Sequence, residues 1–383
     1  MLFRSDIFFI AQSSINQTIT LSGVLSSGTA SGSSTNRLVI DESGSSYSNV
    51  VILTNNANSF VANIRVDFGT LATTSNAALG AGANQILLNT AAVPAAGTLR
   101  LDANGIDINR QVNVNAVGAS VNTNGNNGTI SGVLAGTSSL TKFGTGQLVL
   151  SNGANTFNGP VVVNGGGLLV NGVLPGAASP PAITVNTGGT IGGTGTVGSG
   201  AATRNITVNN GGTLVGGDPT TAAGGDPGVL TVNGNILIGG GSNFRVRITG
   251  GSPSGTDGGS SGGTPTDPAN NGFLFHSTGT LTLNATANIV IDGTGVSFTP
   301  NQQYSYLVAQ SGSASSINVI DDTVFQTIGF TGTNFSLIGD GTGNVYLAFT
   351  PVPEPVTVLG LAAGALGLSG LVRHRLRSRL QRA

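Results

Sequence analysis

Paired carboxylates are the residues of this sequence that could carry out hydrolysis, because one carboxyl group can donate a proton while the other acts as base or nucleophile. Neighbouring residues of a strand point to opposite faces, so adjacent acids could act together only in a turn. Acids in turns are usually solvated, and no pair stands out from the others. We therefore expect no catalytic residue. The pairs considered are Asp41 with Glu42, Asp102 with Asp107, and Asp321 with Asp322.

Nucleophilic and metal chemistry have few residues available. The chain has no cysteine, which excludes thiolate nucleophiles, zinc–thiolate sites and iron–sulfur clusters. His276 is the one histidine before the last ten residues, and no nucleophile elbow accompanies it. Asp218 and Asp226 each stand in Gly-Gly-Asp-Pro, a turn sequence that lacks the tandem Gly-Gly-x-Gly-x-Asp register of calcium-binding repeats. We expect neither a metal nor another cofactor.

Charge is scarce, and this limits both the elements and the partners. Only 8% of the residues are charged, against roughly 25% in an average soluble domain, so long amphipathic helices are not expected. Up to Pro355 there are nine Lys and Arg against fifteen Asp and Glu, a net charge of −6. Nucleic-acid binding needs clustered Lys and Arg that displace counterions. We therefore expect no nucleic-acid partner.

The elements available to position any site are short strands. From Gln12 to Thr350, apolar residues alternate with Thr, Ser and Asn over a few positions, and Asn or Gly closes each run. The first four Asn-ended runs are spaced by 22, 23 and 24 residues, which predicts the rungs of a solenoid. The runs are Val161-Val-Val-Asn164, Ile183-Thr-Val-Asn186, Ile206-Thr-Val-Asn209, Leu230-Thr-Val-Asn233 and Leu281-Thr-Leu-Asn284.

A longer internal repeat supports the solenoid. The segment from Val51 to Leu71 aligns with the segment from Leu148 to Leu168 at a constant offset of 97 residues. This offset is about four rungs, so we expect the two copies to stack on one face. A second shared piece, Leu21-Ser-Gly-Val-Leu25 and Ile130-Ser-Gly-Val-Leu134, has an offset of 109 and implies an insertion between the pieces.

Stacking is what would make such rungs stable. About five inward apolar side chains contribute roughly 1.5–3 kcal/mol each, which does not offset about 1.5 kcal/mol of ordering entropy for every residue of a lone rung. Stacked rungs satisfy one another's backbone groups and close the apolar face into a column. Asn at equivalent corners can form ladders. Outward rows of Thr, Ser and Asn would contact a polysaccharide, or would contact other copies of the same rod and so cause self-association.

A known repeat family is suggested by Leu140-Thr-Lys-Phe-Gly-Thr-Gly-Gln-Leu-Val-Leu-Ser-Asn-Gly-Ala-Asn-Thr-Phe-Asn-Gly159, followed by Val161-Val-Val-Asn-Gly-Gly-Gly-Leu168. This segment resembles the autotransporter-associated, or passenger-associated, β-strand repeat, and the resemblance covers most of the chain from Val50 to Thr350. It implies an all-β fold, a right-handed parallel β-helix like the passengers of bacterial surface proteins. Parallel β-helices also include polysaccharide lyases and glycoside hydrolases, so an enzyme acting on extracellular polysaccharide is the alternative to a structural or adhesive protein.

The C-terminus has three parts in sequence. A short Pro-Glu-Pro motif precedes seventeen uncharged, mostly apolar residues, which as a helix would span about 26 Å, near the lower limit for crossing a membrane. An arginine cluster follows and predicts a cytoplasmic end, with the body outside. The motif comprises Val352, Pro353, Glu354 and Pro355; the anchor, from Val356 to Val372, includes Val356, Leu359, Leu361, Leu366, Leu368, Leu371 and Val372; the cluster comprises Arg373, Arg375, Arg377, Arg379 and Arg382.

This order resembles the PEP-CTERM sorting signal of Gram-negative bacteria. The resemblance implies recognition of Pro353, Glu354 and Pro355 by an exosortase, a membrane-embedded transpeptidase-like enzyme. It further implies a single C-terminal transmembrane helix that anchors the protein before processing, a retention cluster from Arg373 onward, and release or attachment at the cell surface or in the extracellular matrix.

These patterns divide the chain into five parts. The apolar run from Ile7 to Ala11 is shorter than the 7–15 residues of a signal-peptide core, so we expect residues 1–11 to be a truncated or artefactual N-terminus. Residues 12–249 are expected to form the β-helix with its repeats. Residues 250–272, almost all Gly, Ser, Thr, Pro and Asp, are expected to form a flexible loop. Residues 273–350 would add C-terminal rungs, and residues 351–383 would form the sorting signal.

Overall fold

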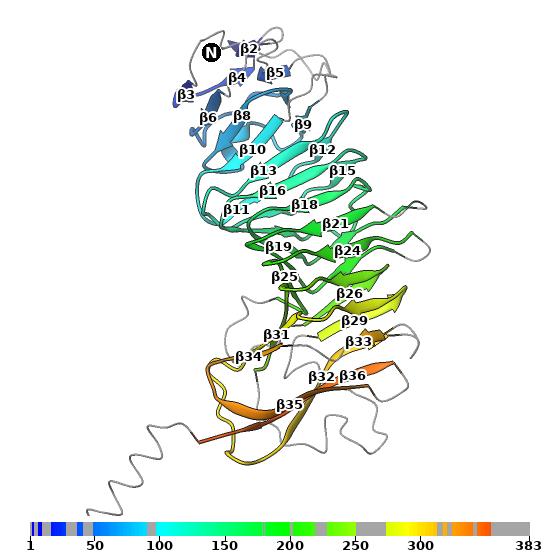
Figure 1. Cartoon of the computed structure of the whole chain (residues 1–383). Coiled ribbons are helices and arrows are strands. Elements are labelled where there is room, and N and C mark those ends of the chain that lie inside the picture. Colours follow the sequence, from blue (N-terminus) through cyan, green and yellow to red (C-terminus); the bar gives the residue numbers. More distant parts are fainter. Residues whose placement is uncertain are drawn as a thin grey trace, which may run out of the picture.

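The computed structural model describes residues 2–3, 7–9, 17–27, 37–40, 49–89, 97–177, 179, 181–199, 202–218, 228–249, 273–311, 317–319, 324–339 and 343–353. Within these ranges the elements are strands, apart from one turn of 3-10 helix, η1 (Ala77–Leu79). The predicted all-β class is confirmed. The strands stack along an elongated coil (Figure 1).

The strands belong to long sheets that run the length of the coil. The twelve-stranded sheet contains β3 (Thr18–Leu21), β6 (Val50–Leu53), β8 (Thr70–Thr73), β10 (Gly97–Leu101), β13 (Ala119–Asn122), β16 (Leu140–Phe143), β18 (Val161–Val163), β21 (Ala182–Val185), β24 (Asn205–Val208), β27 (Ile236–Ile238), β30 (Leu281–Leu283) and β33 (Ile317–Val319). The nine-stranded sheet contains β11 (Ile106–Ile108), β14 (Gly128–Ile130), β17 (Gln147–Leu150), β19 (Gly166–Val170), β22 (Gly189–Gly192), β25 (Thr213–Val215), β28 (Asn243–Arg247), β31 (Asn288–Asp292) and β34 (Val324–Ile328).

Two further sheets share the third face. The six-stranded sheet contains β2 (Ile7–Phe9), β5 (Arg37–Ile40), β7 (Asn63–Val66), β9 (Ile86–Leu88), β12 (Val112–Val114) and β15 (Leu134–Gly136). The seven-stranded sheet contains β20 (Val173–Leu174), β23 (Thr196–Val197), β26 (Val229–Asn233), β29 (Phe273–Thr278), β32 (Tyr304–Ser311), β35 (Gly332–Gly339) and β36 (Asn344–Pro351). A separate pair joins β1 (Leu2–Phe3) to β4 (Ser26–Ser27).

A non-strand segment joins these two sheets into one face. The backbone N–H groups of Thr156 and Asn158 donate to the carbonyls of Leu134 and Gly136, each at 3.0 Å. On the other side, the Asn155 side chain donates to the carbonyl of Val173 at 2.9 Å. The six-stranded sheet therefore continues into the seven-stranded sheet across a single irregular rung.

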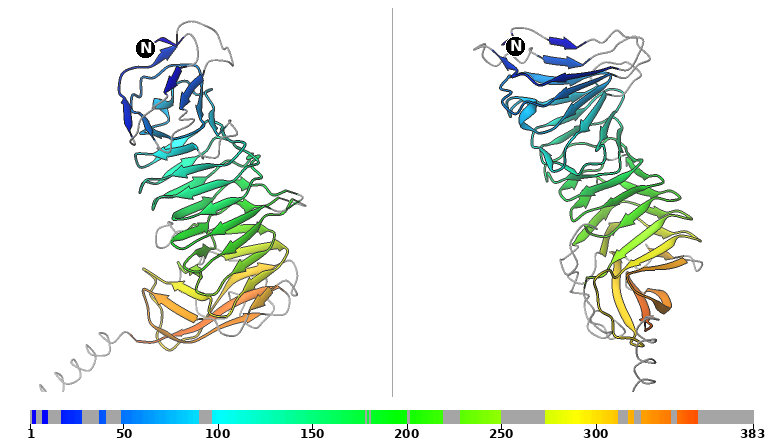
Figure 2. Two further views of the ribbon diagram at one scale, coloured as in Figure 1. Left: turned by 45° about the horizontal axis from the view of Figure 1, so that its top comes forward. Right: turned by 90° about the vertical axis from the view of Figure 1, so that its left-hand side faces the viewer.

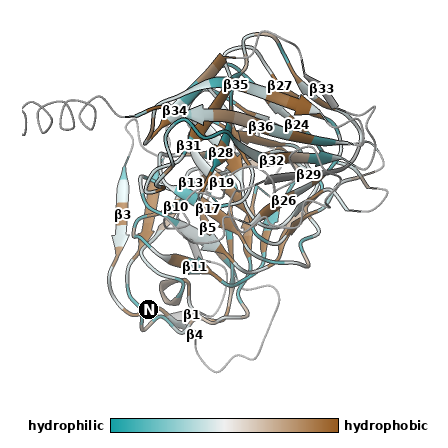
Figure 3. Ribbon diagram, turned by 90° about the horizontal axis from the view of Figure 1, so that it is seen from below, coloured by the Kyte–Doolittle hydropathy of each residue, from teal (hydrophilic) through white to brown (hydrophobic). Residues whose placement is uncertain are grey.

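The chain visits the three faces in turn, as in a parallel β-helix (Figure 2). One rung runs through β10, β11 and β12 before the chain returns to the twelve-stranded sheet at β13. From β10 to β24, parallel partners in that sheet are 21 to 23 residues apart in sequence, in agreement with the expected rung length. Figure 3 looks along the coil and shows β24, β27 and β33 together on one side.

Alternation along each strand builds the core. Inward residues of the twelve-stranded sheet, such as Leu99, Val121, Val163 and Val185, are fully buried, and their outward neighbours are partly exposed. The buried side chains form one continuous hydrophobic cluster from Leu25 to Phe349. Each rung thus relies on its neighbours for burial, because its apolar side chains contact those of the rungs above and below.

The Asn-ended runs are rungs of the coil, as predicted, and they lie on two of its faces. The runs from Val161, Ile183 and Ile206 stack directly in the twelve-stranded sheet. The run from Leu230 lies on a different face, where it forms β26 in the seven-stranded sheet and pairs with β23. Ile236–Ile238 takes the next place in the twelve-stranded sheet and is followed by the run from Leu281. A longer connection after β25 moves the fourth run to a different face, which its tripeptide pattern does not encode.

The expected stacking of the long repeat on one face is also wrong. The first copy begins on β6 in the twelve-stranded sheet, and the second begins on β17 in the nine-stranded sheet. Because a rung here is closer to 22 than to 24 residues, an offset of 97 equals four rungs and one further face.

The two copies nevertheless make the same local contacts with the Ser-Gly-Val-Leu piece of the preceding rung. In each copy one Asn side chain donates to the Ser carbonyl and another accepts from the Leu backbone N–H. The pairs are Asn55 with Ser22 (2.8 Å), Asn152 with Ser131 (2.7 Å), Asn58 with Leu25 (2.8 Å) and Asn155 with Leu134 (2.8 Å). The Asn-to-Ser separations are 33 and 21 residues, which places the expected insertion in the rung between Ser22 and Asn55.

The C-terminal end departs from parallel stacking. β32 pairs antiparallel with β36, and β36 pairs antiparallel with β35. Tyr304, Tyr306 and Phe349 are buried and their rings stack with centroids about 6 Å apart, and Phe298 meets Tyr304 edge-on at 5.2 Å. An aromatic layer therefore covers this end of the aliphatic column.

Several sequence expectations fall outside the described residues. These include the loop of residues 250–272, the Glu354–Pro355 part of the motif, the apolar segment from Val356 to Val372 and the arginine cluster from Arg373 to Arg382. Among the residues that are described, no helix has the length and apolar character needed to cross a membrane.

Candidate functional site

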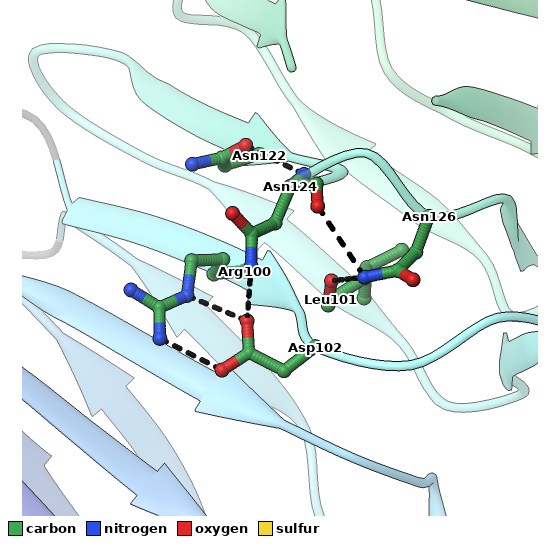
Figure 4. Close-up of polar contacts among 6 residues, drawn as sticks. All are labelled: Arg100, Leu101, Asp102, Asn122, Asn124 and Asn126. Carbon is green, nitrogen blue, oxygen red and sulfur yellow. Dashed lines mark hydrogen bonds and ion pairs between the residues drawn. The ribbon is translucent and has the colours of Figure 1, made fainter. Parts of the chain in front are cut away.

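The carboxylate pair that can be assessed in full is Asp102 with Asp107. Asp102 follows β10, and its two oxygens accept from the Arg100 guanidinium at 2.6 Å and 2.7 Å (Figure 4). The Asn124 side chain donates a further hydrogen bond to Asp102 at 3.1 Å. Asp107 lies on β11, is exposed, and accepts from the Ser131 backbone N–H at 3.3 Å. These contacts give the two acids separate partners rather than a shared proton.

The other candidate residues for catalysis or metal binding show no site among the described residues. Asp41, Glu42, Asp226, Asp321 and Asp322 lie outside the described residues. His276 is on β29, in register with Ser311 of β32. The described part of the chain brings together no three His, Cys, Asp or Glu side chains that could hold a metal ion.

An ion-paired carboxylate that the sequence did not single out is Asp292 on β31. It pairs with Arg245 and, at 3.5 Å, with Arg247, both on β28, and the Thr294 hydroxyl donates to it at 2.6 Å. Burial opposes ionisation, but the hydrogen bonds from Thr294 and Arg245 outweigh it and hold the pKa of Asp292 below its ordinary value. It is an anion fixed between two cations at neutral pH.

The most regular surface is a column of outward side chains on the twelve-stranded sheet, which we call the hydroxyl column. Register aligns one outward residue in each successive strand, and most of these residues carry a hydroxyl group. Along the coil they are Thr98, Ser120, Thr141, Val162, Thr184, Thr207, Leu237 and Thr282. Neighbours are about 4.8 Å apart, the spacing of hydrogen-bonded strands. The predicted outward polar row is therefore present, interrupted by two aliphatic residues.

A corner column runs beside it, where the strands of the same sheet end. The Asn186 side chain donates to Asn164 at 2.7 Å, and the Asn209 side chain donates to Asn186 at 2.8 Å. This is the expected Asn ladder over three rungs. It ends there because Gly239, with no side chain, follows β27 on the next rung.

On the preceding rungs the corner column continues with Phe143, Asn122 and Arg100, which are in register with one another. The Asn122 side chain accepts from the Asn124 backbone N–H at 2.7 Å, and the Asn126 side chain donates to the Leu101 carbonyl at 3.0 Å (Figure 4). Sequence reasoning did not identify this group. Its signal was the alternation in Leu140-Thr-Lys-Phe143, which turns Thr141 and Phe143 outward and Lys142 inward.

Lys142, the single lysine of the chain, lies inside the coil and is fully buried. Its Nζ donates to the carbonyls of Gly144 at 2.8 Å, Gly146 at 2.9 Å and Gly165 at 2.8 Å. Burial lowers the pKa of Lys142 to about 8, so the group is mostly an ammonium ion at neutral pH. Three N–H donors meet three carbonyls, which ties the corner of one rung to the corner of the next.

Glycine is required at this corner by close backbone contact. Gly144 has φ +84°, and a Cβ there would lie 2.6 Å from the Asn122 Oδ1 and 2.7 Å from the Asn124 backbone N. A Cβ on Gly146 would lie 1.8 Å from the carbonyl oxygen of Asn126. The Lys-Phe-Gly-x-Gly segment therefore encodes a buried cation, an outward aromatic ring and two positions without a side chain, where the neighbouring rung can pack against the backbone.

Two buried arginines have the same kind of environment. Arg204 donates to the carbonyls of Pro175, Gly159 and Phe157 at 2.8, 2.7 and 3.1 Å, and burial lowers its pKa to about 10. Arg110 donates to several carbonyls, including those of Leu79 and Ala81 at 3.0 and 2.9 Å. Buried cations bound to carbonyls therefore recur along the coil.

Comparison with known proteins matches part of this site. The model of the family described as "Passenger-associated-transport-repeat" matches residues 140–170, from β16 to β19, which contain Lys142 and its three carbonyl partners. The chain is also 32% identical over 119 residues to the "Adhesin BmaC autotransporter" of Brucella suis biovar 1 (strain 1330). That alignment covers 31% of this chain and 3% of the adhesin, so the chain spans a small part of that relative's length.

Proposed function

We propose that this protein is an exported structural or adhesive rod that acts at the cell surface or in the extracellular matrix of a Gram-negative bacterium. The observation that carries the proposal is the hydroxyl column, which repeats one kind of outward contact on successive rungs from Thr98 to Thr207. A surface of this kind binds an extended partner through many weak contacts, whose effects combine when they are engaged together.

The comparisons support an adhesive role. The matched repeat is associated with passengers, and the matched relative is named as an adhesin. In the resemblance stated above, such rungs form right-handed β-helices on bacterial surfaces, and we propose the same handedness and location for this chain.

The C-terminal tail supplies the proposed route. Val352-Pro-Glu-Pro355 would be recognised by an exosortase-type enzyme, the apolar segment from Val356 to Val372 would hold the protein in the membrane, and the arginine cluster from Arg373 would stay in the cytoplasm. Processing would then free the rod or attach it outside the cell. The support for this step is the order of the three parts in the sequence.

Sorting is tested by expressing the full chain in a bacterium that has an exosortase. We expect antibody to label the body on intact cells and mass spectrometry to find a mature C-terminus near Pro353. The Glu354→Ala variant should keep its tail, while Asp107→Ala, which removes an exposed acid from the body, should be processed normally. An intact tail on the surface-exposed wild-type protein would refute processing.

Adhesion is tested by the retention of cells that display the protein on glycan-coated surfaces. The enzyme alternative would be favoured over an adhesive rod if the wild-type protein degraded the glycan and the Asp102→Asn variant did not. The ion pair with Arg100 argues for the rod, because both oxygens of Asp102 are already bound.

A further inference from the structure

We infer that the corner centred on Phe143, with Arg100, Asn122, Asn124 and Asn164, binds a sugar unit of a neutral polysaccharide. This inference rests on the proposed adhesive function and assigns it a site and a class of ligand. Arg100, Asn122 and Phe143 lie on three successive strands, β10, β13 and β16. Asn124 follows the end of β13, and Asn164 follows β18 and begins the Asn ladder.

Phe143 provides the apolar part of the site. It points outward and is partly exposed, whereas the inward residue beside it, Lys142, is fully buried. In register, Asn122 lies on one side of Phe143, and Asn164 lies on the other, where its backbone N–H bonds the carbonyl of Lys142. An aromatic face between amides matches a pyranose, which has one face of C–H groups and a rim of hydroxyls.

The polar groups around the ring retain unused hydrogen-bonding capacity. The Oδ1 of Asn122 is bound to the backbone of Asn124, and within the described residues its Nδ2 donates no hydrogen bond. The Nδ2 of Asn124 is bound to Asp102, and its Oδ1 points away from that contact (Figure 4). Arg100 binds Asp102 through Nε and one Nη, so its other Nη remains available. The corner thus offers two donors and an acceptor at fixed positions.

The existing contacts also hold these groups in place before a ligand binds. Asn124 has the left-handed φ of +50°, fixed by the bond from its N–H to Asn122. The absence of a side chain at Gly144 allows the next rung to stack directly against the two asparagines. A preorganised site loses less entropy on binding than a flexible one.

Charge and spacing select the class of ligand. The charges of Arg100 and Asp102 compensate each other, the remaining surface groups are neutral amides, and the Lys142 cation is fully buried, so a uronate has no exposed uncompensated cation to bind here. Rungs rise by about 4.8 Å, close to the length of one pyranose, so an extended chain bound at Phe143 could place later units beside Asn164, Asn186 and Asn209.

The test compares binding of the full chain to cellohexaose, as an extended neutral probe, and to a hexamer of galacturonate. We expect saturable binding of cellohexaose and weaker binding of the galacturonate. Phe143→Ala should weaken binding about tenfold, and Asn122→Asp, which keeps the acceptor but removes the Nδ2 donor, should weaken it several-fold. Val324→Ala removes a hydrophobic side chain with 46% exposure from another sheet and should bind like the wild type.

The outcomes separate this site from the general function. Should folding of Phe143→Ala fail, Phe143→Leu keeps an apolar side chain without the flat ring and should also bind more weakly. Wild-type binding that neither Phe143 variant nor Asn122→Asp reduces would overturn the corner site and leave an adhesive rod in place. Stronger binding of galacturonate would overturn the neutral class. Self-association without binding of either glycan would overturn the saccharide site in favour of contact between sister rods.

Discussion

Replacing Lys142 by Met should destabilise the coil locally around β16. The change removes three hydrogen bonds from Nζ. The carbonyl of Gly146 still accepts from the Thr123 hydroxyl at 3.2 Å, whereas the carbonyls of Gly144 and Gly165 lose the Lys142 donor. Each buried acceptor left unpaired costs about 1–3 kcal/mol, and relief of the buried charge together with the apolar Met side chain offsets part of the total. We expect a net loss of about 2–4 kcal/mol in the free energy of unfolding.

The dependence of this loss on pH has a definite sign. The pKa of Lys142 in the folded protein, about 8, is below its ordinary value of 10.5, so between these pH values the unfolded chain binds more protons than the folded one. The free energy of unfolding therefore rises with pH across this range. The cost of burying the charge is fully present below pH 8. Lys142→Met has no such group, so its deficit relative to the wild type should grow from pH 8 to 10.5.

Two measurements check this reasoning. Urea unfolding of both proteins at pH 7.5 and pH 10 gives the two deficits. Amine acylation followed by mass spectrometry gives the exposure of Lys142 directly, because the chain has one lysine, and the α-amino group of the same chain serves as the internal control. Acylation of Lys142 in native buffer at the rate found in urea would refute its burial. A free energy of unfolding of Lys142→Met equal to that of the wild type at both pH values would refute the carbonyl contacts as a source of stability.

Three further changes have expected results of different sizes. Gly144→Ala should lower the free energy of unfolding, measured by heat or urea, by about 2–4 kcal/mol, because Gly144 has a positive φ and a Cβ there would make a contact at 2.6 Å. In the control Gly153→Ala the added Cβ meets nothing within 4 Å, so the free energy of unfolding should not change. Equal effects of the two substitutions would contradict the close stacking. Asn186→Ala removes two ladder bonds at the surface and should cost no more than about 1 kcal/mol, with Asn164→Ala, which removes one, costing less. Because the pKa of Asp292 is lowered, its stabilising effect is present above its ordinary pKa of 3.8 and is lost as the pH falls further. The free energy of unfolding of Asp292→Asn should therefore depend less on pH below about 4 than that of the wild type. An unchanged pH dependence would exclude the pairing with Arg245.

The rungs could be predicted from sequence because alternation and closing Asn or Gly residues report local conformation. The face on which a run lies could not, because it depends on the summed lengths of all the connections before it. The run from Leu230 shows this, since it has the same pattern as the run from Ile206 and lies on a different face. The offset of 97 failed for the same reason, although the local contacts of Asn55 and Asn152 are equivalent.

The candidate site was harder to predict because its key residues contradict usual burial rules. A charged residue in a strand is normally assigned to the surface, yet alternation places Lys142 inside. What stabilises it is a set of backbone carbonyls at glycine-rich corners, and those carbonyls become neighbours only when two rungs stack. The outward polar rows were predictable, since each residue in them follows from the alternation of its own strand.

The burial of Lys142, Arg110 and Arg204 has a consequence for cleavage by proteases. Trypsin-like proteases must draw a lysine or arginine side chain into a deep pocket and straighten the peptide around it. At these three positions the side chain is enclosed and bound to carbonyls contributed by other corners of the coil. Cleavage at these three positions has to wait for neighbouring rungs to separate, so the contacts that hold the coil together also protect these three peptide bonds.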